Sequence, residues 1–160
     1  MEQKRIARYL TAAGALAALV VAVIFFLYVP LLGQQLKTVY PELRGFFWPV
    51  LIGAWIIAGL YVAALADYFR ICARIGQDRS FCRENAQGLL RIARMLFLAA
   101  GLIVLDGLLP CALGHVGNAA WLFFVLAAVI ASGAMGVLAW GLGRLLTRAV
   151  ALKEENDLTV

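Results

Sequence analysis

The chain has 160 residues, the length of a single domain, and 64% of them are hydrophobic while 14% are charged. A soluble domain is about half apolar and about a quarter charged, so this composition excludes an ordinary soluble surface. The net charge of +5 indicates an anionic partner, and the positions of the basic residues decide between nucleic acid and anionic lipid.

The apolar residues fall into long blocks, which indicates membrane spans. Residues 10–36 and 46–66 contain no charge, and residues 95–143 contain one acid, Asp106. A helix needs about 20 apolar residues to cross roughly 30 Å of hydrocarbon. We therefore predict an all-α fold, an integral membrane four-helix bundle in one domain over residues 1–160. Its spans are expected at about 9–32, 46–68, 95–113 and 119–142.

The basic N-terminus followed by an apolar run also suits a secretory signal peptide. That run is about twice as long as the apolar region of a signal peptide, and it lacks a small-residue cleavage site. The first segment is therefore expected to be a permanent helix.

The basic residues gather on one side of the predicted spans. Only Lys37 and Arg44 lie on the other side. Because Lys and Arg are enriched in cytoplasmic loops, we predict a multi-pass protein of the inner (plasma) membrane with both termini in the cytoplasm. Charges beside the membrane favour the anionic lipid of the bilayer as a partner, and no direct contact with nucleic acid is expected.

The second and third spans are separated by the most polar run of the chain, RIGQDRSFCREN. Nothing breaks helix 2 before Gly76, which can end it in the left-handed conformation. Asp78 or Ser80 suits the N-cap of the next helix, which would begin at Phe81. We therefore expect helices 2 and 3 to extend into a cytoplasmic hairpin over about residues 69–94.

The last residues, LLTRAVALKEENDLTV, repeat apolar side chains at helical spacing, so helix 4 is expected to continue as an amphipathic cytoplasmic extension over residues 144–160. Acids at the C-terminal end of a helix oppose its dipole, and the arginines of the hairpin are the nearest counter-charges. We predict that the acidic tail docks against the hairpin and forms a surface for a partner; a solvated tail is the alternative. The residues of that surface are Arg70, Arg74, Asp78, Arg79, Arg83, Glu84, Asn85, Glu154, Glu155, Asn156 and Asp157.

Asp106 lies about eleven residues into helix 3, close to the middle of the bilayer. An ionised aspartate there costs about 2.5–3.5 kcal/mol, so the side chain should face the bundle interior. Ser132 of helix 4 and Trp55 of helix 2 lie at similar depths and can donate hydrogen bonds to it. One interpretation is an interhelical hydrogen bond. The other is a proton or cation relay, for which the spans offer no second station.

The three cysteines and the single histidine do not form a recognisable site. Cys72 and Cys82 flank the hairpin turn in a reducing compartment, where thiols stay free. Cys111 and His115 lie four residues apart on the opposite side, but two ligands do not make a zinc site. Phosphate-binding loops, HExxH and GxSxG motifs are also missing from the sequence. We expect no metal, no cofactor and no enzymatic activity.

Small residues recur every four positions in the first and fourth spans, a pattern that lets helices approach closely in lipid. They are Gly14, Ala18 and Ala22, and Ala128, Ser132 and Gly136. The pattern predicts a tightly packed bundle, and it leaves homo-oligomerisation through a remaining face open.

Two stretches carry a resemblance to a known family: DYFRICARIGQDRSFCRENAQGLLRIARM and, about sixty residues later, ALKEENDLTV. They resemble an uncharacterised family of small bacterial four-span membrane proteins, the domain of unknown function DUF2975, and the layout of the whole chain is similar. The resemblance implies no catalytic residue. Members are often encoded beside a very small helix-turn-helix regulator, which implies a docking platform for such a partner.

The leading hypothesis is a non-enzymatic inner-membrane protein that acts through its cytoplasmic face as an interaction or regulatory partner of a small helix-turn-helix transcriptional regulator. The alternative is a small transporter or channel subunit that uses Asp106. A third hypothesis, lipid binding or immunity-type protection of the membrane, rests only on the basic turns.

Overall fold

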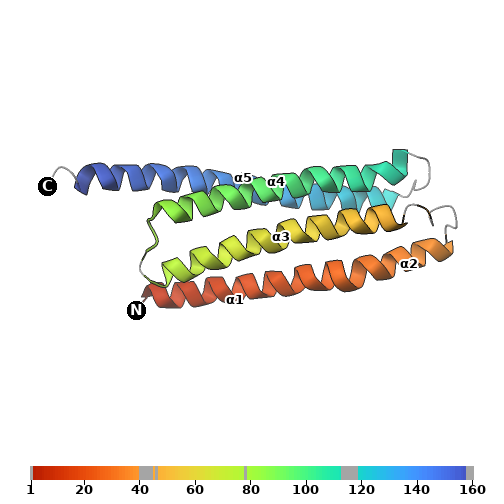
Figure 1. The fold of residues 1–160 in the computed structure, drawn as a ribbon, viewed down its shortest axis with the longest axis horizontal. Helices are drawn as coiled ribbons and strands as arrows, with labels where there is room; N and C mark the ends of the chain where they lie inside the picture. Colours follow the sequence, from red (N-terminus) through yellow and green to blue (C-terminus); the bar gives the residue numbers. More distant parts are fainter. Residues whose placement is uncertain (1, 40–44, 46, 78, 113–118, 158–160) are drawn as a thin grey trace.

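A computed structural model describes residues 2–39, 45, 47–77, 79–112 and 119–157, and these residues form helices without any strand (Figure 1). The helical segments are α1 (Glu2–Val23), η1 (Ile24–Tyr28), α2 (Val29–Val39), α3 (Phe47–Ile75), α4 (Arg83–Ala112) and α5 (Ala119–Asp157). Four helices are long and apolar enough to cross a membrane, over Lys4–Leu31, Phe47–Ile75, Arg83–Leu108 and Trp121–Asn156. The predicted all-α four-helix membrane fold is confirmed.

The start of α1, the end of α5 and the turn between α3 and α4 lie at the same end of the bundle (Figure 1). We call it the terminal end and define it as residues 2–14, 67–91 and 141–157. The opposite end, where α2 ends and α3 begins, is called the far end.

The first helix continues through Pro30 to Val39, whereas the sequence predicted an end near residue 32. Proline lacks an N–H group, and its ring collides with the carbonyl four residues earlier in a regular helix. Here the preceding residues form a π-helical turn, in which the Val29 N–H donates to the Ile24 carbonyl five residues before it. Such a turn lets a helix pass an interrupted hydrogen-bond ladder, so the chain stays helical beyond the proline.

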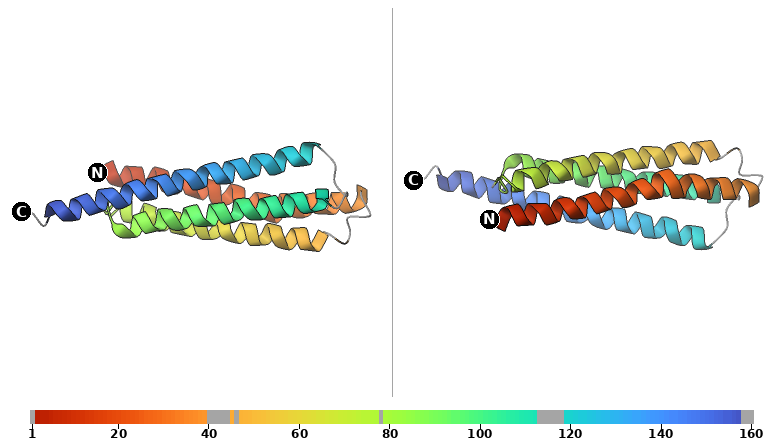
Figure 2. Two further views of the ribbon diagram at one scale, coloured as in Figure 1. Left: turned by 90° about the horizontal axis from the view of Figure 1, so that it is seen from above. Right: turned by 90° about the horizontal axis from the view of Figure 1, so that it is seen from below.

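The helices pack in chain order, with α1 against α3, α3 against α4 and α4 against α5 (Figures 1 and 2). Within the described segments α1 and α5 do not contact each other, so the row is open between its first and last members. Two contacts fix α1 on α3. The Tyr68 hydroxyl donates to the Leu10 carbonyl at 2.9 Å, and Gly14 allows a close approach because a Cβ there would lie 2.6 Å from Tyr68 Cε1.

Small residues let α4 and α5 pack tightly over most of their length. The close approaches pair Gly107 with Val125, Gly136 with Phe97 and Gly143 with Leu90. The buried Ser132 hydroxyl also donates to the Leu96 carbonyl of α4 at 2.9 Å. Two of the three small residues predicted to pack on the fourth helix, Ser132 and Gly136, therefore do so, while Ala128 is exposed.

A cluster of buried apolar side chains lies between α3 and α4. Ala64 and Ile71 of α3 meet Ile92 and Leu96 of α4 in one cluster. Asp67 lies between the first two along α3, so the same packing carries its carboxylate into the interface.

Candidate functional site

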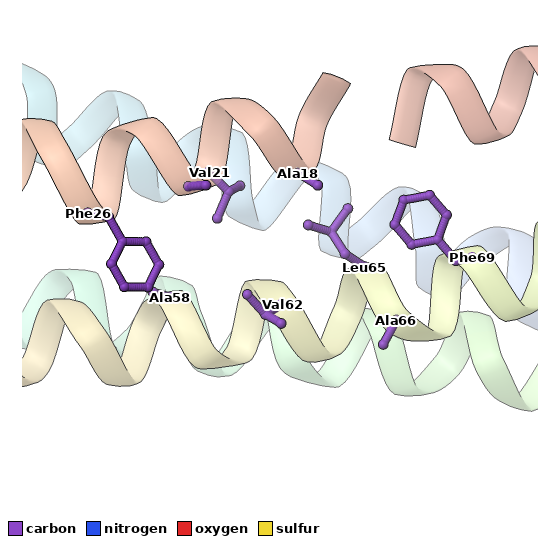
Figure 3. Close-up of a pocket in the computed structure, with 9 residues that line it drawn as sticks. Ala18, Val21, Phe26, Ala58, Val62, Leu65, Ala66 and Phe69 are labelled. Atoms are coloured by element: carbon purple, nitrogen blue, oxygen red, sulfur yellow. The ribbon is translucent and has the colours of Figure 1, made fainter. Parts of the chain in front are cut away.

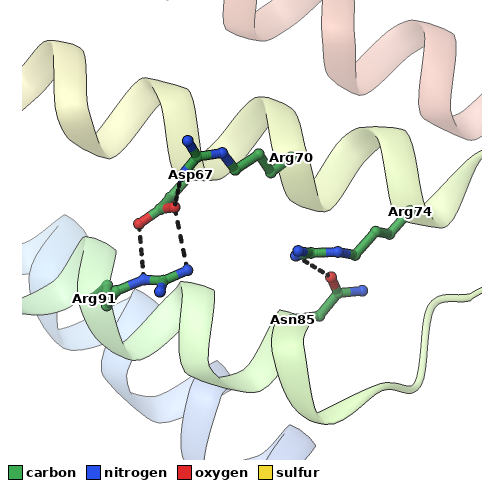
Figure 4. A network of polar contacts seen from close by, with 5 residues as sticks. All are labelled: Asp67, Arg70, Arg74, Asn85 and Arg91. Carbon is green, nitrogen blue, oxygen red and sulfur yellow. Dashed lines mark hydrogen bonds and ion pairs between the residues drawn. The ribbon is translucent and has the colours of Figure 1, made fainter.

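Asp67 joins α3 to α4 at the terminal end, where its side chain is only 5% exposed (Figure 4). Arg91 of α4 donates from Nε to Oδ2 at 3.0 Å and from Nη2 to Oδ1 at 3.3 Å. Arg70, one turn further along α3, donates from Nη1 to Oδ1 at 3.0 Å. One buried carboxylate is therefore held by two cations, one from each helix.

Asp67 is missing from the residues singled out in the sequence, because it directly follows the uncharged block 46–66 and was placed inside the second span. A signal was nevertheless present. An acid that continues an apolar helix needs a partner, and an arginine stands three residues later on the same helix. Arg91, 24 residues away, is the partner that local spacing does not reveal.

Asn85 closes the turn between α3 and α4 from within, since only 1% of the residue is exposed. Its Nδ2 donates to the carbonyls of Arg79 and Ser80, both at 3.1 Å, and its Oδ1 accepts from Arg74 Nη1 at 3.4 Å (Figure 4). Both ends of the amide are thus used inside the turn. Among the predicted partner-binding residues, Asn85 is therefore positioned to shape the surface from beneath.

The start of α4 differs from the prediction. The helix begins at Arg83 and its N-cap is Cys82, whose carbonyl accepts from the N–H groups of Asn85 and Ala86. The prediction of Ser80 as N-cap was wrong, because the Ser80 carbonyl is bound by the Asn85 amide and the residue belongs to the loop. Asp78, the other predicted N-cap, lies outside the described residues.

α3 ends at Ile75, immediately before Gly76, but not through a left-handed glycine. The Gly76 N–H still donates to the Cys72 carbonyl at 3.1 Å. A Cβ on Gly76 would lie 3.4 Å from the Ala7 Cβ, so the end of α3 lies directly beside the first turns of α1.

The remaining charged side chains of the hairpin point outward. The Arg70 side chain is 67% exposed, although it reaches Asp67, and Arg79, Arg83 and Glu84 are exposed. The surface of the hairpin is therefore polar, whereas the Asp67 carboxylate beneath it is buried.

The acidic tail continues as helix. α5 runs on past the α3–α4 turn to Asp157 (Figure 1), and Glu154, Glu155 and Asn156 are exposed on it. The Asp157 side chain lies outside the described part of the chain. Docking of the tail against the hairpin stays a prediction.

Asp106 faces α3, where a Cβ on Gly53 would lie 2.5 Å from its Oδ1. The predicted donors are placed elsewhere: Ser132 is bonded to Leu96, and Trp55 is 48% exposed. Gly53 is six residues, about 9 Å, from the start of α3 at Phe47, so Asp106 packs on the part of α3 toward the far end.

The described thiols are free: Cys72 is buried and Cys82 is partly exposed. The side chains of Cys111 and His115 lie outside the described residues, so the prediction that they hold no metal stays a prediction. Across the described residues, His, Cys, Asp and Glu side chains do not gather in groups of three or more that could hold a metal ion.

The fold and this site define a class of protein: a multi-pass helical membrane protein with a braced polar turn at one end. A family model described as a protein of unknown function, DUF2975, matches residues 31–160, and the chain belongs to that family. The matched region contains α3, α4 and α5 with the whole Asp67 and Asn85 network. Searches of curated proteins and of solved structures returned no match.

Proposed function

We propose that this protein is a non-enzymatic, membrane-anchored interaction partner of a small helix-turn-helix transcriptional regulator, bound at the terminal end. The supporting observation is the division of polar residues there. Asp67 and Asn85 are buried and bonded, while Arg79, Arg83 and Glu84 are exposed above them. A turn braced in this way presents its charges in a fixed arrangement, which lowers the entropy lost when a partner binds.

The proposal places the terminal end in the cytoplasm of a bacterial cell, where a regulator is found. Of the 14 Lys and Arg residues, twelve are predicted from the sequence to lie on the side of the termini and the central loop, and only Lys37 and Arg44 on the other side. The neighbouring small helix-turn-helix regulator implied by the family resemblance supports the choice of partner. Exposed acids of the α5 extension, such as Glu154, offer a basic regulator a second contact of opposite sign.

Co-expression with the adjacent helix-turn-helix regulator, followed by purification of the tagged membrane protein, tests the proposal. We expect the regulator to co-purify, and Arg79→Glu or deletion of residues 154–160 to reduce its recovery at least severalfold. Arg5→Glu is the matched control, because Arg5 is exposed at the same end but lies on α1. Failure of the wild-type protein to retain the regulator would overturn the proposal.

The transporter or channel alternative keeps one supporting observation. Asp106 lies in a candidate span, and no hydrogen bond reaches its carboxylate from the described residues. An intramembrane acid without a bonded partner is a functional candidate by default. Proton or cation flux into liposomes that contain the purified protein, lost in Asp106→Asn with folding retained, would favour this alternative.

A further inference from the structure

An apolar groove of about 260 Å³ runs between α1 and α3 (Figure 3). Small side chains form much of its floor, and two aromatic rings mark its length. The lining includes Ala18, Ala22 and Phe26 from the first helix and Ala58, Ala66 and Phe69 from α3. The small residues predicted to bring α1 against another helix thus do so only at Gly14; beyond it, Ala18 and Ala22 leave a gap.

The groove is open to the surroundings of the bundle. Phe26 is 68% exposed and Val62, on its α3 wall, is 55% exposed. Since α1 packs against α3 and does not reach α5, the described part of the chain places no other helix over it. Within a membrane, the groove therefore faces hydrocarbon.

Two basic residues lie on nearly the same face of α1 as the alanines of the groove. Lys4 and Ala18 are two heptads apart, and so are Arg8 and Ala22, a spacing that turns a straight helix by only about 20° per heptad. Lys4 and Arg8 are exposed, and neither makes an ion pair in the described structure. Two cationic side chains without ion-pair partners among the described residues, Lys4 and Arg8, therefore lie on α1 beyond the apolar groove, at the terminal end of the bundle.

The depths match the dimensions of one lipid. Gly14 contacts Tyr68, next to Asp67, so the charged network marks the edge of the apolar part at the level of Gly14. Arg8 lies six residues, about 9 Å, to the polar side of that level, and the α1 wall of the groove begins at Ala18, four residues, about 6 Å, to its apolar side. A leaflet contributes about 15 Å of hydrocarbon, which ends within the groove before Phe26.

We propose that the α1–α3 groove binds one anionic phospholipid, with an acyl chain along Ala18 and Ala22 and the phosphate at Lys4 and Arg8. The charges favour a lipid over a second copy of the chain. Two parallel copies related by a two-fold axis along the membrane normal would bring Lys4 and Arg8 of both chains to the same end, where like charges repel. This inference is independent of the regulator proposal, because it uses neither the exposed charges Arg79, Arg83 and Glu84 nor the acidic tail on which that proposal rests.

The test is native mass spectrometry of the full-length protein in detergent, titrated with dioleoyl phosphatidylglycerol or dioleoyl phosphatidylcholine. We expect one tightly bound molecule of phosphatidylglycerol per protein and weaker binding of phosphatidylcholine. Lys4→Gln/Arg8→Gln should weaken the first by about tenfold or more and leave the second unchanged. Arg148→Gln/Lys153→Gln, the same loss of charge at the same end on α5, should change neither.

Two further measurements separate this site from other occupants. Ala22→Leu fills the groove and should weaken the binding of both lipids, whereas glycerol phosphate, a headgroup without chains, should not bind. Equal affinity for the two lipids, an equal effect of the α5 control, or a dimer that Ala22→Leu dissociates would each overturn the proposal.

Discussion

Asp67 links α3 to α4 at the terminal end through its ion pair with Arg91. Asp67→Asn removes the charge that two guanidinium groups share, while the amide keeps the volume of the side chain. Because Arg91 is 49% exposed and Arg70 67% exposed, water offsets part of the loss. We therefore expect a decrease of about 1–3 kcal/mol in unfolding free energy, measured by chemical denaturation in detergent.

Glu84→Gln is the matched control for that variant, because it makes the same neutralisation of an acid on an exposed side chain of the hairpin. It should leave unfolding within about 0.5 kcal/mol of the wild-type value. Equal stability of Asp67→Asn and Glu84→Gln would show that the ion pair does not hold the helices together.

A second prediction at the scale of one side chain concerns Asn85. Asn85→Ala removes the two bonds to the loop carbonyls of Arg79 and Ser80 and leaves a cavity, at a cost of about 2 kcal/mol. Amide hydrogen exchange in the loop residues 77–82 should accelerate. Gln87→Ala, an exposed position of the same helix, is expected to leave that exchange unchanged; matching rates in both variants would contradict the role of Asn85.

At the scale of helices, close packing of α4 against α5 can be tested with two glycines of α4. Gly107→Ala would place a Cβ 2.6 Å from Val125 Cγ2, so the helices must separate or the valine must change rotamer, at about 1–3 kcal/mol. Gly101→Ala meets no atom within 4 Å and should cause no loss. The measurement is the thermal unfolding of both variants in the same detergent. If Gly101→Ala were the less stable of the two, the close packing of α4 against α5 at Gly107 would be refuted.

The existence of the four helices could be predicted from the sequence because their apolar blocks are long and the breaks between them polar. Their ends could not. The π-helical turn before Pro30 is a backbone adjustment that cannot be predicted from the presence of a proline alone. The start of α4 depends on an asparagine that binds a loop five and six residues earlier.

The candidate site was only partly predictable for the same physical reason. Arg79, Arg83 and Glu84 are exposed, as a polar turn indicates, and local composition suffices for them. The Asp67–Arg91 pair connects residues 24 positions apart, so it depends on how α3 and α4 are aligned. Likewise, Ser132 was a candidate donor to Asp106, but the alignment of α5 on α4 places its hydroxyl on the Leu96 carbonyl instead.

At the scale of the whole molecule, the direction of insertion is the prediction that the proposed function requires. Arg79→Cys, in a variant whose three native cysteines are replaced by alanine, should react with a membrane-impermeant maleimide only after the cells are opened. Lys37→Cys, predicted on the other side, should react in intact cells. Labelling of Arg79→Cys in intact cells would place the hairpin outside and end the regulator proposal.

The length of α5 has a mechanical consequence. Its 39 residues form one uninterrupted helix of about 58 Å, almost twice the thickness of the hydrocarbon it crosses. At one end of the helix Trp121 Nε1 donates to the Gly107 carbonyl at 3.0 Å, while the other end extends past the α3–α4 turn (Figure 1). A partner that binds the protruding segment therefore holds the end of a stiff helix. A sideways force on that segment either bends α5 or tilts it against α4, and tilting strains the hydrogen bond between Trp121 and Gly107 at the opposite surface.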